Sequence, residues 1–315
     1  MSGSNEVSPA GLIAVDKIGG VVLFLDPTTY ETTKTLDSFP PRPHELVLSP
    51  DRTLAYVPIY GDGIHGKNPH PGHLIAVIDL AQQAHVGDID VAPLLAPHGS
   101  EFGADGLLYT VCENSGVVAV IDAAAKRVLA TIPVGSTNSH RIALAPGSTR
   151  LYTENEEDPT ASVLDLVTRQ KVAEIAMPNG SAGLAISPDG RTLLLVDAKA
   201  PELAVVDTAT DRVTRPIRLD GHDKPAQIAR WSPDGRHVVV TSYEAPLATL
   251  LDPALERQRL LHLGRGPMNM GFHPDGRTVL IANHDEGTLA VVDMDQSEVL
   301  RTVPCGKGVE TLSFF

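Results

Sequence analysis

Short apolar runs that end in aspartate recur along the whole chain. Seven runs have this form, and they end at Asp26, Asp79, Asp122, Asp165, Asp207, Asp252 and Asp293. The gaps between successive aspartates are 53, 43, 43, 42, 45 and 41 residues. A period in the low forties built from short β-type runs is typical of a β-propeller, in which each repeat forms one blade of four strands.

A turn motif separates the first two strands of each repeat. It is clearest as Ser-Pro-Asp-Gly at residues 187–190 and 232–235. Proline presets the backbone for a turn and Asp-Gly tolerates a tight return, so the motif predicts a hairpin. Because each repeated Asp is followed by a short polar stretch such as AAAKR or TATDR, a further hairpin is expected there.

Counting the first strand of each repeat predicts seven blades. The expected first strands are Glu45–Leu48, Glu101–Gly103, Arg141–Leu144, Gly183–Ile186, Ile228–Trp231, Asn269–Phe272 and Glu310–Phe315. The last has no strands after it, whereas three N-terminal runs (GLIAVD, GVVLFLD and KTLDSF) have no first strand. We therefore predict an all-β fold, a seven-bladed β-propeller forming one domain over residues 1–315. The N-terminal strands should close the ring by pairing with the C-terminal strand, which removes open sheet edges. Residues 1–10 are expected to form a flexible N-terminal segment.

Two segments carry a family resemblance. The stretches Gly116–Gly135 and Gly287–Gly306, alternating with runs such as SPDGRTLLLVD, resemble the YVTN/YncE-like seven-bladed β-propellers. The resemblance covers nearly the whole chain and implies the fold. It leaves function open, because that family contains binding proteins, surface proteins and enzymes, and its relatives include lactonases and lyases.

Composition narrows the possible partners. The net charge is −14 and only 4% of residues are aromatic, which argues against nucleic acid and anionic membranes as partners. No run reaches membrane-spanning length and no secretory signal is recognisable. Cys112 and Cys305 lack metal-site spacing, which favours a reducing compartment, and a cytoplasmic location is expected. The oligomeric state remains open.

One position of the repeat holds histidine in three consecutive blades. It lies seven residues before the Asp of the Ser-Pro-Asp turn, or before the residue equivalent to that Asp. This position is at the start of the innermost strand and is expected to face the propeller axis. We call it the axial position; it holds His44, His98, His140, Ala182, Gln227, Met268 and Val309. Three neutral imidazoles on neighbouring strands predict a divalent metal site, for Zn²⁺ first, with Fe, Mn or Ni possible. The open alternative is a metal-free pocket in which these residues bind an anionic ligand.

Charged residues nearby supply candidates for catalysis. Four carboxylates stand at the ends of second strands or in the loops that follow, namely Glu113, Glu154, Glu156 and Asp197. One of them could complete a metal shell or move a proton, with Glu154 as the first candidate and Glu113 as the second. Arg42 or Arg141, which flank the axial histidines, could hold a substrate carboxylate, and Arg42 is the first candidate. Glu45 and Arg141 each follow an axial histidine, so strand alternation should turn them away from the axis unless the backbone bulges. Tyr60 and Tyr243 occupy equivalent loop regions, where surface exposure is expected.

The first gap is about ten residues longer than its neighbours. The extra stretch lies at residues 61–73 and reads GDGIHGKNPHPGH. Because functional loops are often insertions on a rigid scaffold, we expect a lid or wall over the axial pocket, with His65, His70 or His73 as a further ligand or acid–base group. The alternative is an exposed loop away from the substrate.

These observations predict an enzyme that acts on a small polar or anionic molecule at a metal site on the axis. Lactone or ester opening, elimination and isomerisation all fit. Two alternatives remain open, namely a non-catalytic ligand-binding or scaffold propeller and a metal-free lactonase. No phosphate-binding or dinucleotide-binding glycine motif is present in the sequence.

Overall fold

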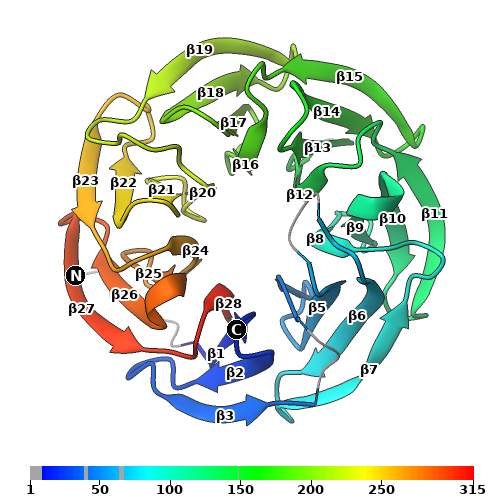
Figure 1. Cartoon of the computed structure of the whole chain (residues 1–315), viewed down its shortest axis with the longest axis horizontal. Helices are drawn as coiled ribbons and strands as arrows, with labels where there is room; N and C mark the ends of the chain where they lie inside the picture. The colour runs from blue at the N-terminus through cyan, green and yellow to red at the C-terminus, as the bar shows by residue number, and fades with distance from the viewer. Residues whose placement is uncertain (1–8, 39–41, 64–66, 148) are drawn as a thin grey trace, which may run out of the picture.

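Seven four-stranded antiparallel sheets form a ring around a central axis (Figure 1). The structure is a computed structural model that describes residues 9–38, 42–63, 67–147 and 149–315. It confirms the all-β, seven-bladed propeller. The predicted flexible segment at residues 1–10 lies largely outside the described residues. Within the described part, no helix is long and apolar enough to span a membrane.

The first strand of each blade lies nearest the axis, around the centre of Figure 1. These inner strands are β28 (Val309–Phe314), β4 (Val47–Leu48), β8 (Pro97–Phe102), β12 (Ser139–Leu144), β16 (Ser181–Ile186), β20 (Ile228–Trp231) and β24 (Pro267–Phe272). The second strands are β1 (Leu12–Asp16), β5 (Leu54–Gly61), β9 (Leu108–Cys112), β13 (Arg150–Asn155), β17 (Thr192–Asp197), β21 (Val238–Ser242) and β25 (Thr278–Asn283).

The two outer strands of each blade complete the sheets. The third strands are β2 (Val21–Leu25), β6 (Pro71–Asp79), β10 (Val117–Asp122), β14 (Thr160–Asp165), β18 (Glu202–Asp207), β22 (Leu247–Leu251) and β26 (Thr288–Asp293). The outermost are β3 (Thr32–Leu36), β7 (Ala84–Asp90), β11 (Arg127–Pro133), β15 (Gln170–Ala176), β19 (Arg212–Arg218), β23 (Gln258–His262) and β27 (Glu298–Pro304). Two short 3₁₀ turns, η1 (Glu113–Ser115) and η2 (His284–Glu286), follow β9 and β25.

The ring closes by pairing the two ends of the chain. Strand β28 pairs antiparallel with β1, and the closing sheet has the order β28-β1-β2-β3. The Phe315 nitrogen also donates to the Gly11 oxygen at 3.0 Å. The predicted closure, with one C-terminal and three N-terminal strands, is therefore confirmed.

The repeated residues stabilise turns. In the Ser-Pro-Asp motif the serine hydroxyl donates to the aspartate at 2.6 Å, as in Ser187 to Asp189, and accepts the Thr192 backbone N–H. Each aspartate that ends a third-strand run accepts backbone N–H groups of the next hairpin, as Asp122 does from Ala125 at 2.9 Å. Such side-chain bonds to the local backbone stabilise turns, so the repeated aspartates have a structural role.

Packing between neighbouring blades forms the hydrophobic core. One cluster joins Leu194 and Val196 of β17 to Val238 and Val240 of β21, all fully buried. Comparable clusters fill the spaces between the other blades. Apolar packing between the blades therefore fixes their positions around the axis.

Bulges near the starts of inner strands determine what faces the axis. Register shifts occur in β8, β12, β16, β24 and β28. In β12, Ser139 pairs with Asn155 but Ile142 pairs with Thr153, so His140 and Arg141 lie within the bulge. A bulge interrupts the in–out alternation of a strand, and two consecutive side chains can then face the same side.

Candidate functional site

One mouth of the axis holds a cavity of about 330 Å³ that we call the axial pocket. Its lining residues come from six blades and comprise Lys17, His44, His98, His140, Arg141, Glu156, Gln227, Tyr243, Glu244, Met268, His284 and Glu310. Five of the seven axial positions are among them. The predicted shared cavity for the three histidines is therefore present.

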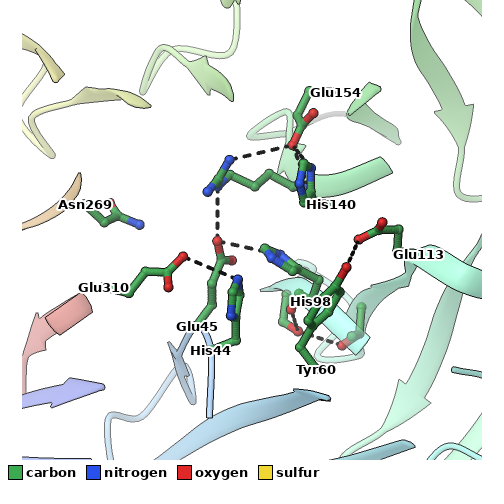
Figure 2. Close-up of polar contacts among 12 residues, drawn as sticks. His44, Glu45, Tyr60, His98, Glu113, His140, Glu154, Asn269 and Glu310 are labelled. Carbon is green, nitrogen blue, oxygen red and sulfur yellow. Dashed lines mark hydrogen bonds and ion pairs between the residues drawn. The ribbon is translucent and has the colours of Figure 1, made fainter. Parts of the chain in front are cut away.

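The three imidazoles lie side by side along this wall (Figure 2). Ring centroids are 4.3 Å apart for His44 and His98 and 5.0 Å apart for His98 and His140. All three side chains are buried. Tyr60 packs behind them, with its ring 5.1 Å from His44 and 5.2 Å from His98.

Arg141 lines the axial pocket and pairs with Glu45, which lies beside His44 and His98 in Figure 2. These positions correct the expectation from strand alternation. The Arg141 Nε donates to Glu45 Oε1 at 3.1 Å, and the same oxygen lies 3.7 Å from His98 Nδ1. The β12 bulge explains the position of Arg141. Before β4, Pro43 bridges to Ile59 while Val47 pairs with Tyr56, so the pairing slips by one residue around Glu45.

His44 is held in a polar network by Lys17 and Glu310. The Lys17 Nζ lies 3.2 Å from His44 Nε2 and 3.0 Å from Glu310 Oε2. Glu310 Oε1 is 3.3 Å from His44 Nε2. Because lysine can only donate, the Lys17 contact matches a neutral His44 that accepts through Nε2 and carries its proton on Nδ1.

Burial controls the ionisation of this wall. Desolvation lowers the pKa of both His44 and His98 well below the usual histidine range, and nearby cationic groups including Lys17 add to this. Burial would raise the pKa of Glu310, but His44, Lys17 and Arg141 outweigh it and hold that pKa at about 2. At neutral pH His44 and His98 are therefore neutral, and they lie beside an ionised Glu310.

His140 lies between two carboxylates. Its Nδ1 is 2.8 Å from Glu154 Oε1 and its Nε2 is 3.3 Å from Glu156 Oε2. Glu154 is fully buried and also accepts the Arg141 backbone N–H at 3.1 Å, whereas Glu156 lines the pocket. Glu154 therefore contacts His140 from behind and does not reach the cavity.

One metal-ligating group emerges from the described residues. Ligand atoms of His140, Glu154 and Glu156 lie within 4.8 Å of one another, a spacing that can hold a cation. The structure thus brings two of the four candidate carboxylates, Glu154 and Glu156, next to His140. The assignment of His44 and His98 as metal ligands stays a prediction.

Glu113 lies one layer behind the pocket wall. It is buried at the start of η1 and accepts the Tyr60 hydroxyl at 2.8 Å (Figure 2). Burial, and then the negative Glu113, raise the pKa of Tyr60, so the phenol stays protonated. Tyr60 is 1% exposed, so the expectation that it is a surface residue was wrong.

Arg42 and the insertion lie away from the pocket. Arg42 is exposed and does not line the cavity, where Arg141 supplies the guanidinium instead. His73 is exposed and lies 2.9 Å from Asp90, and His70 pairs with Asp62 at 2.7 Å. None of the described insertion residues lines the pocket, so the predicted lid is not observed there. His65 lies outside the described residues.

Sequence reasoning missed Lys17, Glu310 and His284 as pocket residues. Glu310 directly follows an axial position, as Glu45 and Arg141 do, so the repeat contains a signal for it. Lys17 follows β1 and His284 begins η2. Both enter the pocket from connections after second strands, where no periodic pattern marks them.

Comparison with known proteins supports the fold. No family model matches the chain, and no curated protein matches it. Among solved structures, hydrazine synthase of Kuenenia stuttgartiensis is similar, with a TM-score of 0.70 and 20% identity over 86% of this chain and 89% of that chain. This likeness shows the propeller fold alone. No family model supports the YVTN/YncE-like resemblance.

Proposed function

We propose that the protein is a metal-dependent enzyme that acts on a small polar molecule in the axial pocket. The observation that carries the proposal is the position of His140, whose two ring nitrogens both face carboxylates. With Nδ1–H donating to Glu154, the Nε2 lone pair points toward negatively charged Glu156. A cation between Nε2 and Glu156 relieves that repulsion.

This arrangement has the layout of a supported metal ligand. A metal-bound histidine commonly donates its other N–H to a carboxylate, which fixes the ring orientation. Glu154 fits that positioning role because it is buried and also bonded to the Arg141 backbone. His140, Glu156 and His98 are our proposed ligands. His44 fits less well, because the ammonium of Lys17 lies at its Nε2.

The remaining wall is suited to binding and orienting a substrate. A divalent ion at His140 would supply Lewis acidity toward a carbonyl or phosphoryl oxygen. Lys17 and Arg141 place two positive groups on the lining, which favours a substrate with a carboxylate or similar group. Glu310 is a poor general base because its pKa is about 2. We therefore propose lactone or ester opening, elimination or isomerisation, with Lys17 and Arg141 orienting the substrate.

A metal-free pocket is the second candidate, and the same observation favours it. A doubly protonated His140 would donate to both Glu154 and Glu156 without any cation. The protein would then be a metal-free lactonase or a non-catalytic binding propeller. The metal-dependent enzyme loses its activity when a chelator removes the metal, whereas the metal-free pocket keeps its activity or ligand binding.

Metal analysis separates them. We would load purified protein with Zn²⁺, Mn²⁺ or Fe²⁺, remove excess ion and measure bound metal for the natural protein, His140→Ala and Glu156→Gln. The control is His262→Ala, which removes an exposed histidine on the outermost strand β23. We expect one bound ion per chain that both pocket variants lose and the control keeps. Equal metal content in all four proteins, or none in any, would overturn the metal site.

Catalysis is tested with the loaded protein on a panel of lactones and activated esters. Turnover should fall by about a hundredfold or more in His140→Ala and remain in His262→Ala. Turnover that survives chelation supports the metal-free lactonase. A stoichiometric metal with no turnover on any substrate of the panel would argue for a binding function.

A further inference from the structure

The opposite mouth of the axis contains a second polar site. Two adjoining cavities of about 450 and 440 Å³ open where the inner strands end. Both are lined by Arg52, Arg230, Met270, Leu312 and Ser313. Turn residues such as Ser49 and Ser232 line their rims, whereas the axial pocket is lined at the starts of the same strands. The two sites therefore lie at opposite mouths.

Arg230 dominates this second site. It lies on β20, and its side chain makes one hydrogen bond within the described residues, from Nε to Asn269 Oδ1 at 3.4 Å. No described carboxylate lies within ion-pair distance of it. The other guanidinium N–H groups remain available to a ligand. Arg52 adds a second guanidinium to the same lining.

Two neighbouring side chains also have unused polar atoms. Thr311 is 7% exposed and its hydroxyl has no hydrogen-bond partner in the described structure. The Trp231 indole N–H is likewise unpartnered. Thr311 lines one cavity and Trp231 the other. Buried polar atoms without partners are rare and costly, so a group that accepts from them would stabilise this mouth.

Charge at this mouth favours an anion despite the overall charge of −14. Burial lowers the pKa of Arg230 and Arg141 adds to this, while Glu45 and Glu101 act against it. Because no described carboxylate forms an ion pair with Arg230, its positive charge stays available to an anion. Asp234 also lines one cavity, but it is already bonded to Ser232 at 2.6 Å and to Arg236 at 2.7 Å. The apolar part of the lining includes Phe272 and Phe314.

We propose that this mouth binds a small oxyanion attached to an apolar body, with the anionic group on Arg230 and Arg52 and the apolar part against Trp231 and Phe314. Carboxylate and phosphate both match the planar fork of a guanidinium. Thr311 and Trp231 would donate further hydrogen bonds. The site needs no metal and is independent of the function proposed for the axial pocket.

Calorimetric titration with benzoate and with phenyl phosphate tests this site. We expect saturable binding of at least one probe at one site per chain, weakened about tenfold or more by Arg230→Gln. Thr311→Val, which keeps the side-chain shape, should weaken binding about threefold or more. Preference for benzoate identifies a carboxylate ligand, and preference for phenyl phosphate identifies a phosphate ester.

Two control variants test whether the probes bind by general charge attraction or in the axial pocket instead. Arg259→Gln removes an exposed positive charge on β23 and should leave the affinity unchanged. His140→Ala should also leave it unchanged, because the axial pocket lies at the other mouth. The proposal is overturned if neither probe saturates, if Arg230→Gln and Thr311→Val both bind as the natural protein does, or if Arg259→Gln or His140→Ala weakens binding as much as Arg230→Gln.

Discussion

The blades that begin with β4, β8 and β12 form one half of the ring, and those that begin with β16, β20 and β24 form the other. The two halves share the same inner-strand backbone but differ in the side chains that face the axis. Strands β8 and β12 in one half, and β16 and β24 in the other, all bulge near their starts. In the first half the axial positions hold His98 and His140, while in the second they hold Ala182 and Met268. The bulge is therefore a property of the repeat, and the side chains alone decide where chemistry can occur.

The contrast extends one layer behind the axis. Glu154 and Val196 occupy equivalent places in adjacent blades. Each lies one residue before the partner of the first inner-strand residue, in the pairs Ser139–Asn155 and Ser181–Asp197. Val196 packs in an apolar cluster, whereas Glu154 accepts from His140 and Arg141. A buried carboxylate at a place normally filled by a hydrophobic residue is costly unless its partners remain. We therefore interpret Glu154 as support for the site rather than for the fold.

Replacing Glu154 by its neighbour's residue should have the largest effect. Glu154→Val leaves the buried Arg141 with Glu45 as its one remaining ion-pair partner among the described residues and removes the acceptor for His140 Nδ1, so we expect a loss of about 3–5 kcal/mol in the free energy of unfolding. Urea denaturation measures it.

The matched change in the other half is Val196→Ala, which removes only apolar volume and should cost about 2 kcal/mol. A Glu154→Val variant as stable as the natural protein would show that the buried polar network contributes nothing to stability.

The repeat made the fold and one wall of the pocket predictable from sequence. Hydrophobic period, turn motifs and strand counting identify the seven blades and their closure, because each blade repeats the same order of strands and turns. The column of His44, His98 and His140 is visible for the same reason. In a periodic fold, residues at the same position of successive repeats lie at equivalent places in neighbouring blades.

The missed half of the site follows from features that do not repeat. Strict alternation places Arg141 and Glu45 away from the axis, and only the bulges turn them inward. Lys17 and His284 come from connections between strands, where spacing carries no information. The insertion was overvalued, since length alone does not determine the direction in which a loop folds.

Gly99 tests how tightly the first half is packed. It follows His98 in the β8 bulge, and a Cβ there would lie 2.7 Å from the His140 oxygen and 2.8 Å from the Arg141 Cα. Because these are backbone atoms, Gly99→Ala should shift the two strands and cost about 1–3 kcal/mol, measured by urea denaturation. Gly271→Ala in the other half meets Leu312 only at 3.2 Å and should cost less. Equal costs would indicate that the two halves are packed alike.

Glu101 and Arg230 occupy equivalent positions, three residues after the axial position, in opposite halves. Burial raises the pKa of Glu101 to about 7, although the Leu144 N–H and Arg230 act against it. A carboxyl with a raised folded-state pKa contributes stability below its unfolded pKa near 4.5, and that stability is lost as pH rises through about 7. The free energy of unfolding of Glu101→Gln, taken relative to that of the natural protein, should therefore rise by about 1–3 kcal/mol as the pH is raised from 5 to 8. Parallel urea titrations of both proteins cancel the contributions of other groups. A constant difference across this range would show that Arg230 already compensates the carboxylate.

The smallest effect concerns the tyrosines that stand in equivalent loop regions of the two halves. Tyr60 donates to buried Glu113 at 2.8 Å, while the more exposed Tyr243 donates to Asp285 at the same distance. Because a lost hydrogen bond costs more where water cannot replace it, Tyr60→Phe should lower the free energy of unfolding by about 1–2 kcal/mol. Tyr243→Phe should change it by about 0.5 kcal/mol or less, because water can reach Asp285. Thermal and urea denaturation of the pair would measure the difference, and a larger loss for Tyr243→Phe would reverse our assignment of the buried polar network to the histidine half of the ring.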